Sequence, residues 1–493
     1  MLQFEPFDVL PEMSLQAIEG NGGMRGRPEH KMANAIAIAM ENDIVAGRYP
    51  VGSPLGTEAE LCAQYGASRW VIREAVAIVQ NDGLVTVRRG RGGGAVINGT
   101  PARSLASAVS GFLLYANLDN EQIITARLTV DRLLYQSAAQ ALDREVPPRA
   151  LELTELSASA GDPSAISAEI LEQIIDLSGN AFLGVFALAL SKLTSCRLAL
   201  NGPEVTSQPD ARISAKLMAL RQRQLKCIIC VDANGAIEAA LEVAELWRSL
   251  FSAQTCGGGS IQDIAHSRRV AGRIADILDQ GQHSQAAGIV STMIMLDAMN
   301  IAPGSDRFLG AEATLMERYG VARNQLREGI RILERDGFVR AEAGRNGGIR
   351  AGNADYATLV ERALRVFRFL ELSAGDMKAL ALELRLTAVQ LALAKAHDRL
   401  ELANALRSIS GVSGLQREAD AFLLLAHRAD DAFIRLLEQI CHRISADWIR
   451  DDDVQRPKHL LKKLADVIES GNYVQSRRTI AQLHHDFTLA GAY

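Results

Sequence analysis

LGTEAELCAQYGASRWVIREAVAIVQNDGLVTVRRGRGGG, residues 55–94, occurs a second time in this chain as LGAEATLMERYGVARNQLREGIRILERDGFVRAEAGRNGG, residues 309–348. The two stretches align without a gap at a constant offset of 254 residues, and 18 of the 40 positions are identical. Such self-similarity marks an internal duplication. A weaker echo pairs residues 127–129 with 385–387, both Arg-Leu-Thr, at an offset of 258. The duplication is therefore predicted to continue into the sequence that follows each stretch.

Each stretch predicts a helix, a tight turn and a second helix. In the first copy, 58–65 has helical spacing of apolar residues, Gly66 interrupts it, and Ser68 offers a hydroxyl that caps the next helix. This order is the helix-turn-helix pattern. An apolar stripe on the second helix docks it on the core of its domain. The stripe consists of Ile72, Val76 and Val79 in the first copy and of Leu326, Ile330 and Leu333 in the second.

Two arginines stand one turn apart on a flank of the second helix in both copies. They are Arg69 and Arg73 in the first copy and Arg323 and Arg327 in the second. Arginines near the N-terminal end of a docked helix suit the major groove of DNA, where they bond guanine bidentately or neutralise phosphate. The neighbouring residues complete the predicted contact set: Ser68 and Trp70 in the first copy, Asn324 and Gln325 in the second.

A glycine-rich hairpin follows the second helix and is interpreted as the wing of a winged helix-turn-helix. Glycines let the backbone approach a partner closely, and guanidiniums enter a narrow groove. The wing residues predicted to contact DNA are Arg88, Arg89 and Arg91 in the first copy and Arg345 and Asn346 in the second. Glu342 and Ala343 replace the first two of these arginines in the second copy. We therefore expect the second wing to hold phosphate less strongly.

The alternative interpretation makes these arginines a solvated helix face and the hairpin an ordinary turn. Two copies that keep the same arginines, glycines and turn, while surface positions between them vary, favour the DNA-binding interpretation. The formal net charge of -5 argues against a polycation that binds nucleic acid along its whole length. DNA binding must therefore come from local basic patches.

The domain organisation follows from the length and from the repeat. A chain of 493 residues is too long for one hydrophobic core, because cores stop growing near ~250 to 300 residues. The sequence between and after the repeated stretches is rich in Ala and Leu at helical spacing. The predicted fold class is mostly α, with two winged helix-turn-helix domains, each followed by an all-α helical-bundle domain. The predicted boundaries are a flexible tail at 1–29, winged helix-turn-helix domains at 30–100 and 263–353, helical bundles at 101–254 and 354–493, and a Gly-rich linker at 255–262.

The cysteines and the N-terminus indicate an intracellular protein. Six cysteines are scattered without a framework spacing, which suggests reduced thiols. Cys227 and Cys230 form a C-x-x-C, a pattern open to zinc or redox chemistry, but no second pair follows, and a buried helix face is the favoured interpretation. The N-terminus has no basic segment followed by an apolar core. We expect a cytoplasmic protein without membrane contact.

In these residues both copies resemble the GntR family of bacterial regulators, specifically its FadR-like branch. The resemblance covers about forty residues per copy. The first copy matches the family pattern with Glu58, Leu61, Gly66, Ser68, Arg69, Arg73, Glu74, Ala75, Gly83, Leu84, Val85 and the wing at 90–94. The second matches it with Glu312, Leu315, Gly320, Arg323, Arg327, Glu328, Gly337 and Val339, whereas Ala322 replaces a serine and Gly329 an alanine. Because such proteins carry one winged helix per chain and dimerise on a near-palindromic operator, this chain resembles a covalently fused dimer.

The helical blocks resemble the FCD domain of that family, which commonly holds a metal through one aspartate and three histidines and recognises a small carboxylate. The first block retains the Ser-Gly-Asn at 178–180, but Ser167 and Leu171 stand at the ligand positions, as Glu418 and Phe422 do in the second block. A metal site needs its complete donor set, so we expect neither a metal nor another cofactor.

Two further pairs of residues follow from the same resemblance. His484 and His485 fall near another family histidine, and without partners they are interpreted as surface or capping residues. Arg127 and Arg385 are the repeated cations of the blocks and the candidate contacts for a small organic acid effector, because a guanidinium holds a carboxylate bidentately. A salt bridge on the helix surface is the favoured interpretation of each arginine.

The leading hypothesis is a sequence-specific DNA-binding transcriptional regulator, controlled by a small-molecule effector in the helical blocks. Its two winged helices act as an intrachain pseudo-dimer on two half-sites of a double-stranded DNA operator. The alternative is a protein-interaction or architectural module with weak or lost DNA binding. An enzyme is disfavoured, because no nucleophile triad, phosphate loop or metal-ligand triad stands at a recognisable spacing. Further pairing of chains into a homo-oligomer stays open.

Overall fold

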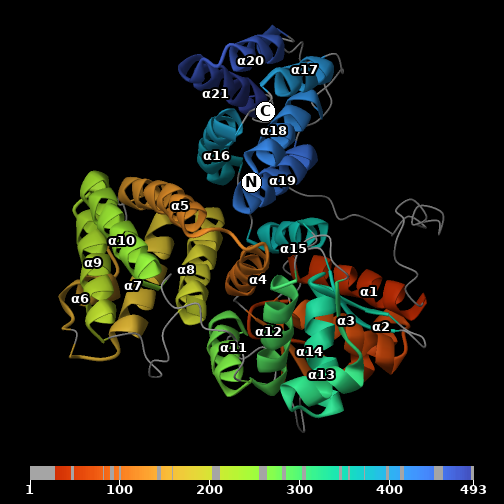
Figure 1. Ribbon diagram of the computed structural model, residues 1–493. Coiled ribbons are helices and arrows are strands. Elements are labelled where there is room, and N and C mark those ends of the chain that lie inside the picture. Colours follow the sequence, from red (N-terminus) through yellow and green to blue (C-terminus); the bar gives the residue numbers. More distant parts are fainter. Residues whose placement is uncertain are drawn as a thin grey trace. The chain divides into compact units, whose positions relative to one another are not determined.

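The computed structural model describes the chain apart from residues 1–27, 46–48, 82, 89–93, 99–100, 142–145, 158, 202–210, 255–263, 280–284, 302–306, 343–346, 353–355, 371, 373, 396–398, 411–415, 449–458 and 490–493. The predicted linker at 255–262 and most of the predicted tail therefore lie outside the described residues. The fold is mostly helical, as predicted, with two small sheets (Figure 1). The described residues form two compact units, one made of those up to Gln80 and Val85–Ile97, the other of Asn81–Leu84 and those from Asn98 onward.

The first unit contains the first repeated stretch, here called the first module. Its elements are α1 (Pro28–Val45), β1 (Pro54–Gly56), α2 (Glu58–Tyr65), α3 (Arg69–Asn81), β2 (Val85–Arg88) and β3 (Gly94–Ile97). Thr57 and Glu60 cap α2 reciprocally, and Gly66 ends it in the left-handed conformation at φ 61, which favours glycine. The strands pair antiparallel in the order β1-β3-β2. The sequence thus builds a helix, a turn, a second helix and a hairpin.

The second repeated stretch lies in the larger unit and is here called the second module. Its elements are α11 (Ile264–Asp279), α12 (Gln285–Met299), β4 (Phe308–Gly310), α13 (Glu312–Tyr319), α14 (Arg323–Arg335), β5 (Val339–Glu342) and β6 (Gly348–Ala351). Gly320 ends α13 at φ 61, and the strand order is β4-β6-β5. Leu326, Ile330 and Leu333 are all buried, so the predicted stripe docks α14.

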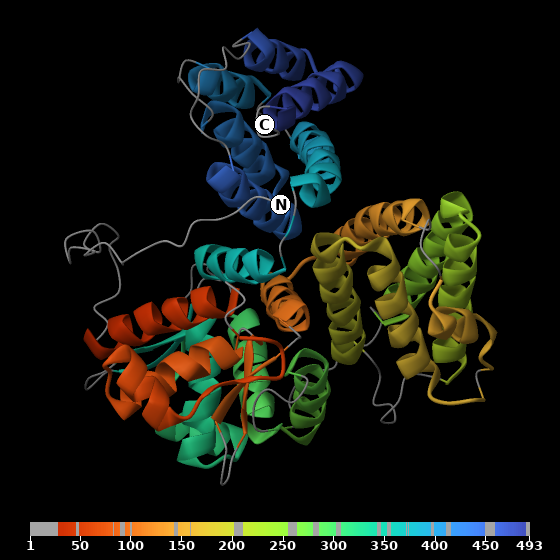
Figure 2. The same ribbon diagram turned by 180° about the vertical axis from the view of Figure 1, so that it is seen from behind.

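The first helical block follows the first module. It consists of α4 (Pro101–Tyr115), α5 (Asn120–Gln140), α6 (Pro148–Glu155), α7 (Pro163–Ser178), α8 (Ala181–Asn201), α9 (Ala211–Ile229) and α10 (Ala233–Gln254). Helix α9 packs between α7 and α10, and α5 packs on α7, α8 and α10, as Figure 2 also shows. The window Ala181–Leu200 of α8 is long and apolar enough to cross a membrane, but 61% of it is buried. A core helix of a globular protein has the same character.

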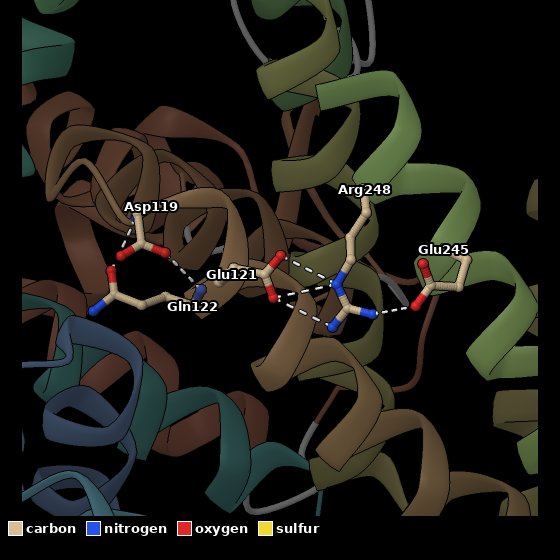
Figure 3. Close-up of polar contacts among 5 residues, drawn as sticks. All are labelled: Asp119, Glu121, Gln122, Glu245 and Arg248. Atoms are coloured by element: carbon tan, nitrogen blue, oxygen red, sulfur yellow. Dashed lines mark hydrogen bonds and ion pairs between the residues drawn. The ribbon is translucent and has the colours of Figure 1, made fainter. Parts of the chain in front are cut away.

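Polar contacts fix the N-terminus of α5 in this block (Figure 3). Asp119 and Gln122 form a reciprocal capping box, in which each side chain accepts from the backbone N–H of the other. Two residues after the cap residue Asp119, Glu121 accepts from Arg248 of α10 at 3.1 Å (Nε to Oε1), and Glu245 accepts from Nη1 of the same arginine at 2.6 Å. The start of α5, and with it the register of Arg127 two turns later, is therefore tied to α10.

The second helical block ends the chain. It consists of α15 (Tyr356–Phe369), α16 (Ala374–Lys395), α17 (Arg399–Ser410), α18 (Gln416–Ala429), α19 (Ala432–Trp448), α20 (His459–Glu469) and α21 (Tyr473–Leu489). Helix α16 packs against α18, α19 and α21, and α17 packs against α20. Asp431 caps α19 by accepting from the backbone N–H groups of Phe433 and Ile434 at 2.9 and 3.0 Å.

The two helical blocks share a core within the larger unit. The rings of Phe182 and Phe367 are 5.0 Å apart and those of Phe186 and Phe433 are 6.0 Å apart. All four residues are buried. At the edge of this core, Asn180 Nδ2 of the first block donates to a backbone carbonyl of the second at 3.0 Å. Aromatic burial on this scale makes the contact a continuation of the core of each block.

Candidate nucleic-acid interface

An exposed arginine fork lies at the start of α3. Arg73 donates to Glu58 of α2 through Nε to Oε2 at 2.7 Å and through Nη2 to Oε1 at 3.1 Å. Arg69, one turn earlier, brings its Nε to 3.8 Å from the same carboxylate. The hydrogen bond from Arg73 holds the pKa of Glu58 below its usual value, so the carboxylate is charged at neutral pH. The arginine side chains are 79% and 69% exposed for Arg69 and Arg73, which leaves their outer N–H groups open to a ligand.

The same fork occurs in the second module. Arg327 of α14 donates to Glu312 of α13 through Nε at 2.6 Å and Nη2 at 3.1 Å, and Arg323 Nε lies 3.7 Å from that carboxylate. These distances differ from those of the first module by about 0.1 Å. Two modules with different flanking residues therefore hold their paired arginines in one geometry. Sequence comparison identified the arginines but missed Glu58 and Glu312 as the residues that orient them.

The other predicted contacts on these helices fall into two groups. Trp70 and Asn324 are exposed on α3 and α14. Ser68 and Gln325 act in capping, because Ser68 Oγ accepts from Val71 N at 3.4 Å and Gln325 Oε1 accepts from Ala322 N at 3.1 Å. The structure thus gives Ser68 and Gln325 a local structural role.

The wings are described only in part. Arg89, Arg91, Arg345 and Asn346 lie outside the described residues, as does the side chain of Arg88, so their contacts stay predictions. In the second module Glu342 is described, and its carboxylate accepts from Arg350 Nε at 2.7 Å. A groove of about 440 Å³ between α14 and the β5–β6 hairpin has more carboxylates than guanidiniums along its walls: Glu312, Glu334 and Glu342 against Arg327 and Arg331. The second module therefore presents a less basic groove than its arginine fork alone suggests.

A cationic cluster lies inside the first helical block. Arg127 is 6% exposed, with Nε 3.5 Å from Asp131 and Nη1 donating to Thr194 at 3.2 Å. Arg221 of α9 is 2% exposed and donates to the hydroxyl of Tyr135 at 2.8 Å and to Gln224 at 2.9 Å. Burial lowers the pKa of Arg127, and the neighbouring guanidinium lowers it further.

The charges of this cluster do not balance. Two buried guanidiniums face one carboxylate, and Gln224 Nε2 is buried without a hydrogen-bond partner among the described residues. Sequence reasoning missed Arg221, because this arginine is not repeated in the second block. The residues 254 and 258 positions later are Gln475 and Thr479. The interpretation of Arg127 as a salt bridge on the helix surface was wrong, since α5 turns this side chain inward.

The equivalent arginine of the second helical block is neutralised internally. Arg385 is 3% exposed and meets Glu438 of α19 through Nη2 at 2.7 Å and through Nε at 3.1 and 3.2 Å. Its Nη1 lies 2.9 Å from His484 Nδ1, and its guanidinium lies 3.8 Å from the centre of the Phe422 ring. Arg385 is therefore not a surface salt bridge either.

The histidines and the ligand positions of the FCD resemblance are also placed. His484 is buried, so its interpretation as a surface residue was wrong, whereas His485 is exposed. Burial lowers the pKa of His484 to about 3, so its ring is neutral. Ser167, Leu171 and Phe422 are buried. Among the described residues no group of three or more His, Cys, Asp or Glu side chains is arranged to hold a metal ion.

The C-x-x-C at the end of α9 does not form a buried face. Cys227 is half-buried, but Cys230 is exposed, which corrects the interpretation from the sequence. Helix α9 ends at Ile229, just before Cys230, and Val231 adopts a positive φ of 60.

Comparison with known proteins places the first module in a family. Residues 32–94 match the family model of bacterial regulatory proteins of the gntR family. The galactonate operon transcriptional repressor of Escherichia coli K12 is 42% identical over 57 residues, which are 12% of this chain and 25% of that protein. The HTH-type transcriptional repressor NanR of Cronobacter sakazakii is 30% identical over 106 residues, 22% of this chain and 40% of that protein.

These matches cover a limited part of each protein. The chain spans about a quarter of the length of the first of these relatives. The solved structure of Streptococcus agalactiae GntR is matched over 44% of this chain and 99% of that one at 20% identity, with a TM-score of 0.28, which is too low to support a statement about the fold. Residues 32–94 therefore form a helix-turn-helix domain of the gntR family of bacterial regulatory proteins, similar to domains of named transcriptional repressors.

Proposed function

We propose that the chain is a sequence-specific DNA-binding transcriptional regulator whose two modules read two half-sites of one operator. The observation that carries this proposal is the exposed arginine fork, present with matching distances in both modules. We propose that the chain has two winged-helix domains, at 30–100 and 263–353, and two FCD-like helical bundles, at 101–254 and 354–493. The tail at 1–29 and the linker at 255–262 complete this division. The chain thus acts as an intrachain pseudo-dimer in the cytoplasm.

The fork explains how the arginines would read a base pair. Each carboxylate takes one edge of the arginine, Nε and Nη2, and so fixes the plane of the guanidinium before DNA arrives. A side chain with its plane already fixed loses less rotational freedom on binding. Its outer N–H groups face the groove and are suited to the acceptors of guanine or to a phosphate oxygen.

The two modules differ beside the fork, so the operator should be asymmetric. The exposed residue after Arg69 in the first module is Trp70, whereas the exposed residue after Arg323 in the second is Asn324. Selection from a random-sequence DNA pool tests this: the enriched site should contain two different half-sites about one or more helical turns apart, with ~10 base pairs per turn. Enrichment of a perfect palindrome, or of no motif, would contradict the proposal.

Control by an anionic effector is proposed for the first helical block. Arg127 and Arg221 leave one positive charge in excess over Asp131, and buried charge without a partner is costly. A small organic acid would supply the missing carboxylate. In the second block Glu438 already supplies one to Arg385, so we propose no effector there.

A thermal-shift screen of small mono- and dicarboxylates tests the effector proposal. A binding acid should raise the melting temperature of the whole chain, because it binds the folded state and adds about 2.7 kcal/mol to the free energy of unfolding at a hundredfold excess over Kd. Arg221→Leu should abolish the shift, and Arg149→Leu, at an exposed arginine of the same block, should leave it unchanged. A shift that survives Arg221→Leu would rule out the cluster as the site.

The second candidate function is a protein-interaction module with lost DNA binding, favoured by the acidic walls of the groove beside α14. If the whole chain has lost DNA binding, the random-pool selection would enrich no motif; if only the second module has lost it, the selection would enrich a half-site for the first module. Further pairing of chains is proposed only as a secondary property and is tested by the mass of the chain in solution.

A further inference from the structure

Tyr115, the last residue of α4, contacts the second module through its ring and its hydroxyl. The ring of Tyr115 stacks on that of Phe338 with centroids 4.7 Å apart. Its hydroxyl lies 2.7 Å from Gly352 O and 3.3 Å from Phe338 O, and Arg307 Nη2 donates to it at 3.1 Å. A phenol has one proton to donate, and the shorter contact makes Gly352 O its acceptor while Arg307 occupies a lone pair.

The two residues that Tyr115 contacts, Phe338 and Gly352, form the base of the β5–β6 hairpin. Phe338 precedes β5 and Gly352 follows β6, and Gly352 N donates to Phe338 O at 2.7 Å. The base admits no side chain on the glycine, because a Cβ there would lie 2.2 Å from Gly337 O. Phe338 N also donates to Leu333 O of α14 at 2.8 Å. A displacement of this base therefore moves the wing and the arginine-bearing helix together.

A second contact between the first helical block and the second module involves α11. Lys192 of α8 donates through Nζ to Ile277 O, in the last turn of α11, at 2.6 Å. A cation is favourable at the C-terminal end of a helix, where backbone carbonyls lack partners. Beside it, α11 packs on both α4 and α8. Tyr115 and Lys192 thus both tie the second module to the first helical block.

The position of the second block that is equivalent to Tyr115 lacks a hydroxyl. At an offset of 254 from Tyr115, also the last residue of its helix, the second block has Phe369, which carries no hydroxyl. The first module also belongs to a separate compact unit, whereas the second module and both helical blocks form one unit.

We propose that Tyr115 is a positioning residue, which sets the orientation of α14 on the first helical block and thereby the half-site spacing that the chain accepts. The inference rests on the proposed function, because it requires both modules to bind DNA. Removing the hydroxyl loosens the second module, so that operators with a wrong spacing are bound more readily relative to the correct one.

The test uses the full chain and a set of operators whose half-site spacing changes by single base pairs. Tyr115→Phe is expected to reduce the ratio of affinities between the best and the worst spacing about threefold to tenfold, the effect of one hydrogen bond on a linked contact. Affinity for an isolated half-site should stay the same. Amide exchange should accelerate in 339–342 and 348–351 but not in 69–80. Tyr473→Phe, which loses a hydroxyl contact with Gln390, is the control and should change none of these.

A second variant, Lys192→Met, tests the same role if Tyr115→Phe fails to fold. This substitution removes the second contact and should shift the spacing ratio in the same direction by a smaller factor. If both variants keep the spacing ratio and the exchange rates of the parent while Arg327→Ala weakens binding, the positioning role is wrong and the proposed function stands. If Arg327→Ala also leaves binding unchanged, the second module does not read DNA, and both the proposed function and the positioning role fall.

Discussion

The exposed arginines of the two modules are matched, whereas the buried arginines of the two helical blocks are not. Arg73 and Arg327 each meet a carboxylate 15 residues earlier in the chain, at distances that agree closely. Arg127 is one of two guanidiniums beside a single aspartate, but Arg385 has its own glutamate. An ion pair whose two residues lie in one short stretch is retained wherever that stretch is repeated. The contacts of a buried arginine with distant helices are retained only if each partner residue is also retained.

The strongest expected effect tests whether both forks contact DNA. If the four arginines of the two forks each neutralise one phosphate, the affinity of the whole chain should fall by about 10²-fold between ~50 and ~200 mM salt, and further if the wings add contacts, because bound counterions are released. Arg73→Ala and Arg327→Ala should each reduce the slope of log affinity against log salt by about 1. The slopes are measured by fluorescence anisotropy. Equal slopes in parent and variants would mean that the forks lie away from the phosphates.

The difference between the buried arginines predicts unequal losses of stability. Glu438→Ala leaves Arg385 charged and buried, and should lower the free energy of unfolding by about 3 to 5 kcal/mol. Asp131→Ala should cost less, because Asp131 lies 3.5 Å from Arg127 and makes one contact. Urea unfolding followed by circular dichroism compares the two. A larger loss for Asp131→Ala would reverse our assignment of the satisfied and the unsatisfied site.

The forks themselves are compared by removing one arginine at a time. Arg73→Ala and Arg327→Ala should each weaken operator binding by about 1 to 3 kcal/mol and relax readout at one half-site only. The first module should matter more, because the wall of the second groove contains Glu342. Footprinting on the selected operator shows which half is lost. Arg103→Ala, at an exposed arginine paired with Glu172 on the first helical block, is the matched control and should leave the footprint intact.

A further expected effect is a pH dependence that arises in the second block. His484 has a pKa of about 3 when folded, below the value near 6.5 of an unfolded histidine, because it is buried beside Arg385. The unfolded chain therefore binds the extra proton between these two values. The stability that the neutral His484 side chain contributes is complete above pH ~6.5. This contribution declines as the pH falls toward 3, by at most ~1.4 kcal/mol per pH unit.

Urea unfolding at pH 7, 5.5 and 4.5 measures this decline. His484→Gln keeps an acceptor near Arg385 and cannot be protonated, so its stability should change less between these pH values than that of the parent. His485→Gln, at the exposed neighbour, is the control. An identical pH dependence in the parent and in His484→Gln would show that other groups cause the acid sensitivity.

The sequence was sufficient for the features that depend on local order. Gly66, the stripe at Ile72 and the paired arginines could be read directly, because helix caps and helical spacing act within a few residues. The inward orientation of Arg127 could not, since it depends on α8 and α9, whose residues Thr194 and Arg221 lie 67 and 94 positions later. For the same reason Glu438 was not recognised as the partner of Arg385.

The aromatic core that joins the two helical blocks has a consequence for the working concentration of the protein. Two separate chains that meet through such a surface must overcome the loss of translational freedom, and they come apart when diluted. Here Phe182 and Phe367 belong to one polypeptide, so their contact forms at the same extent in a single molecule as in a concentrated solution. Occupancy of an operator by this chain should therefore rise in simple proportion to its copy number, without the steep threshold that dimerisation of free subunits imposes.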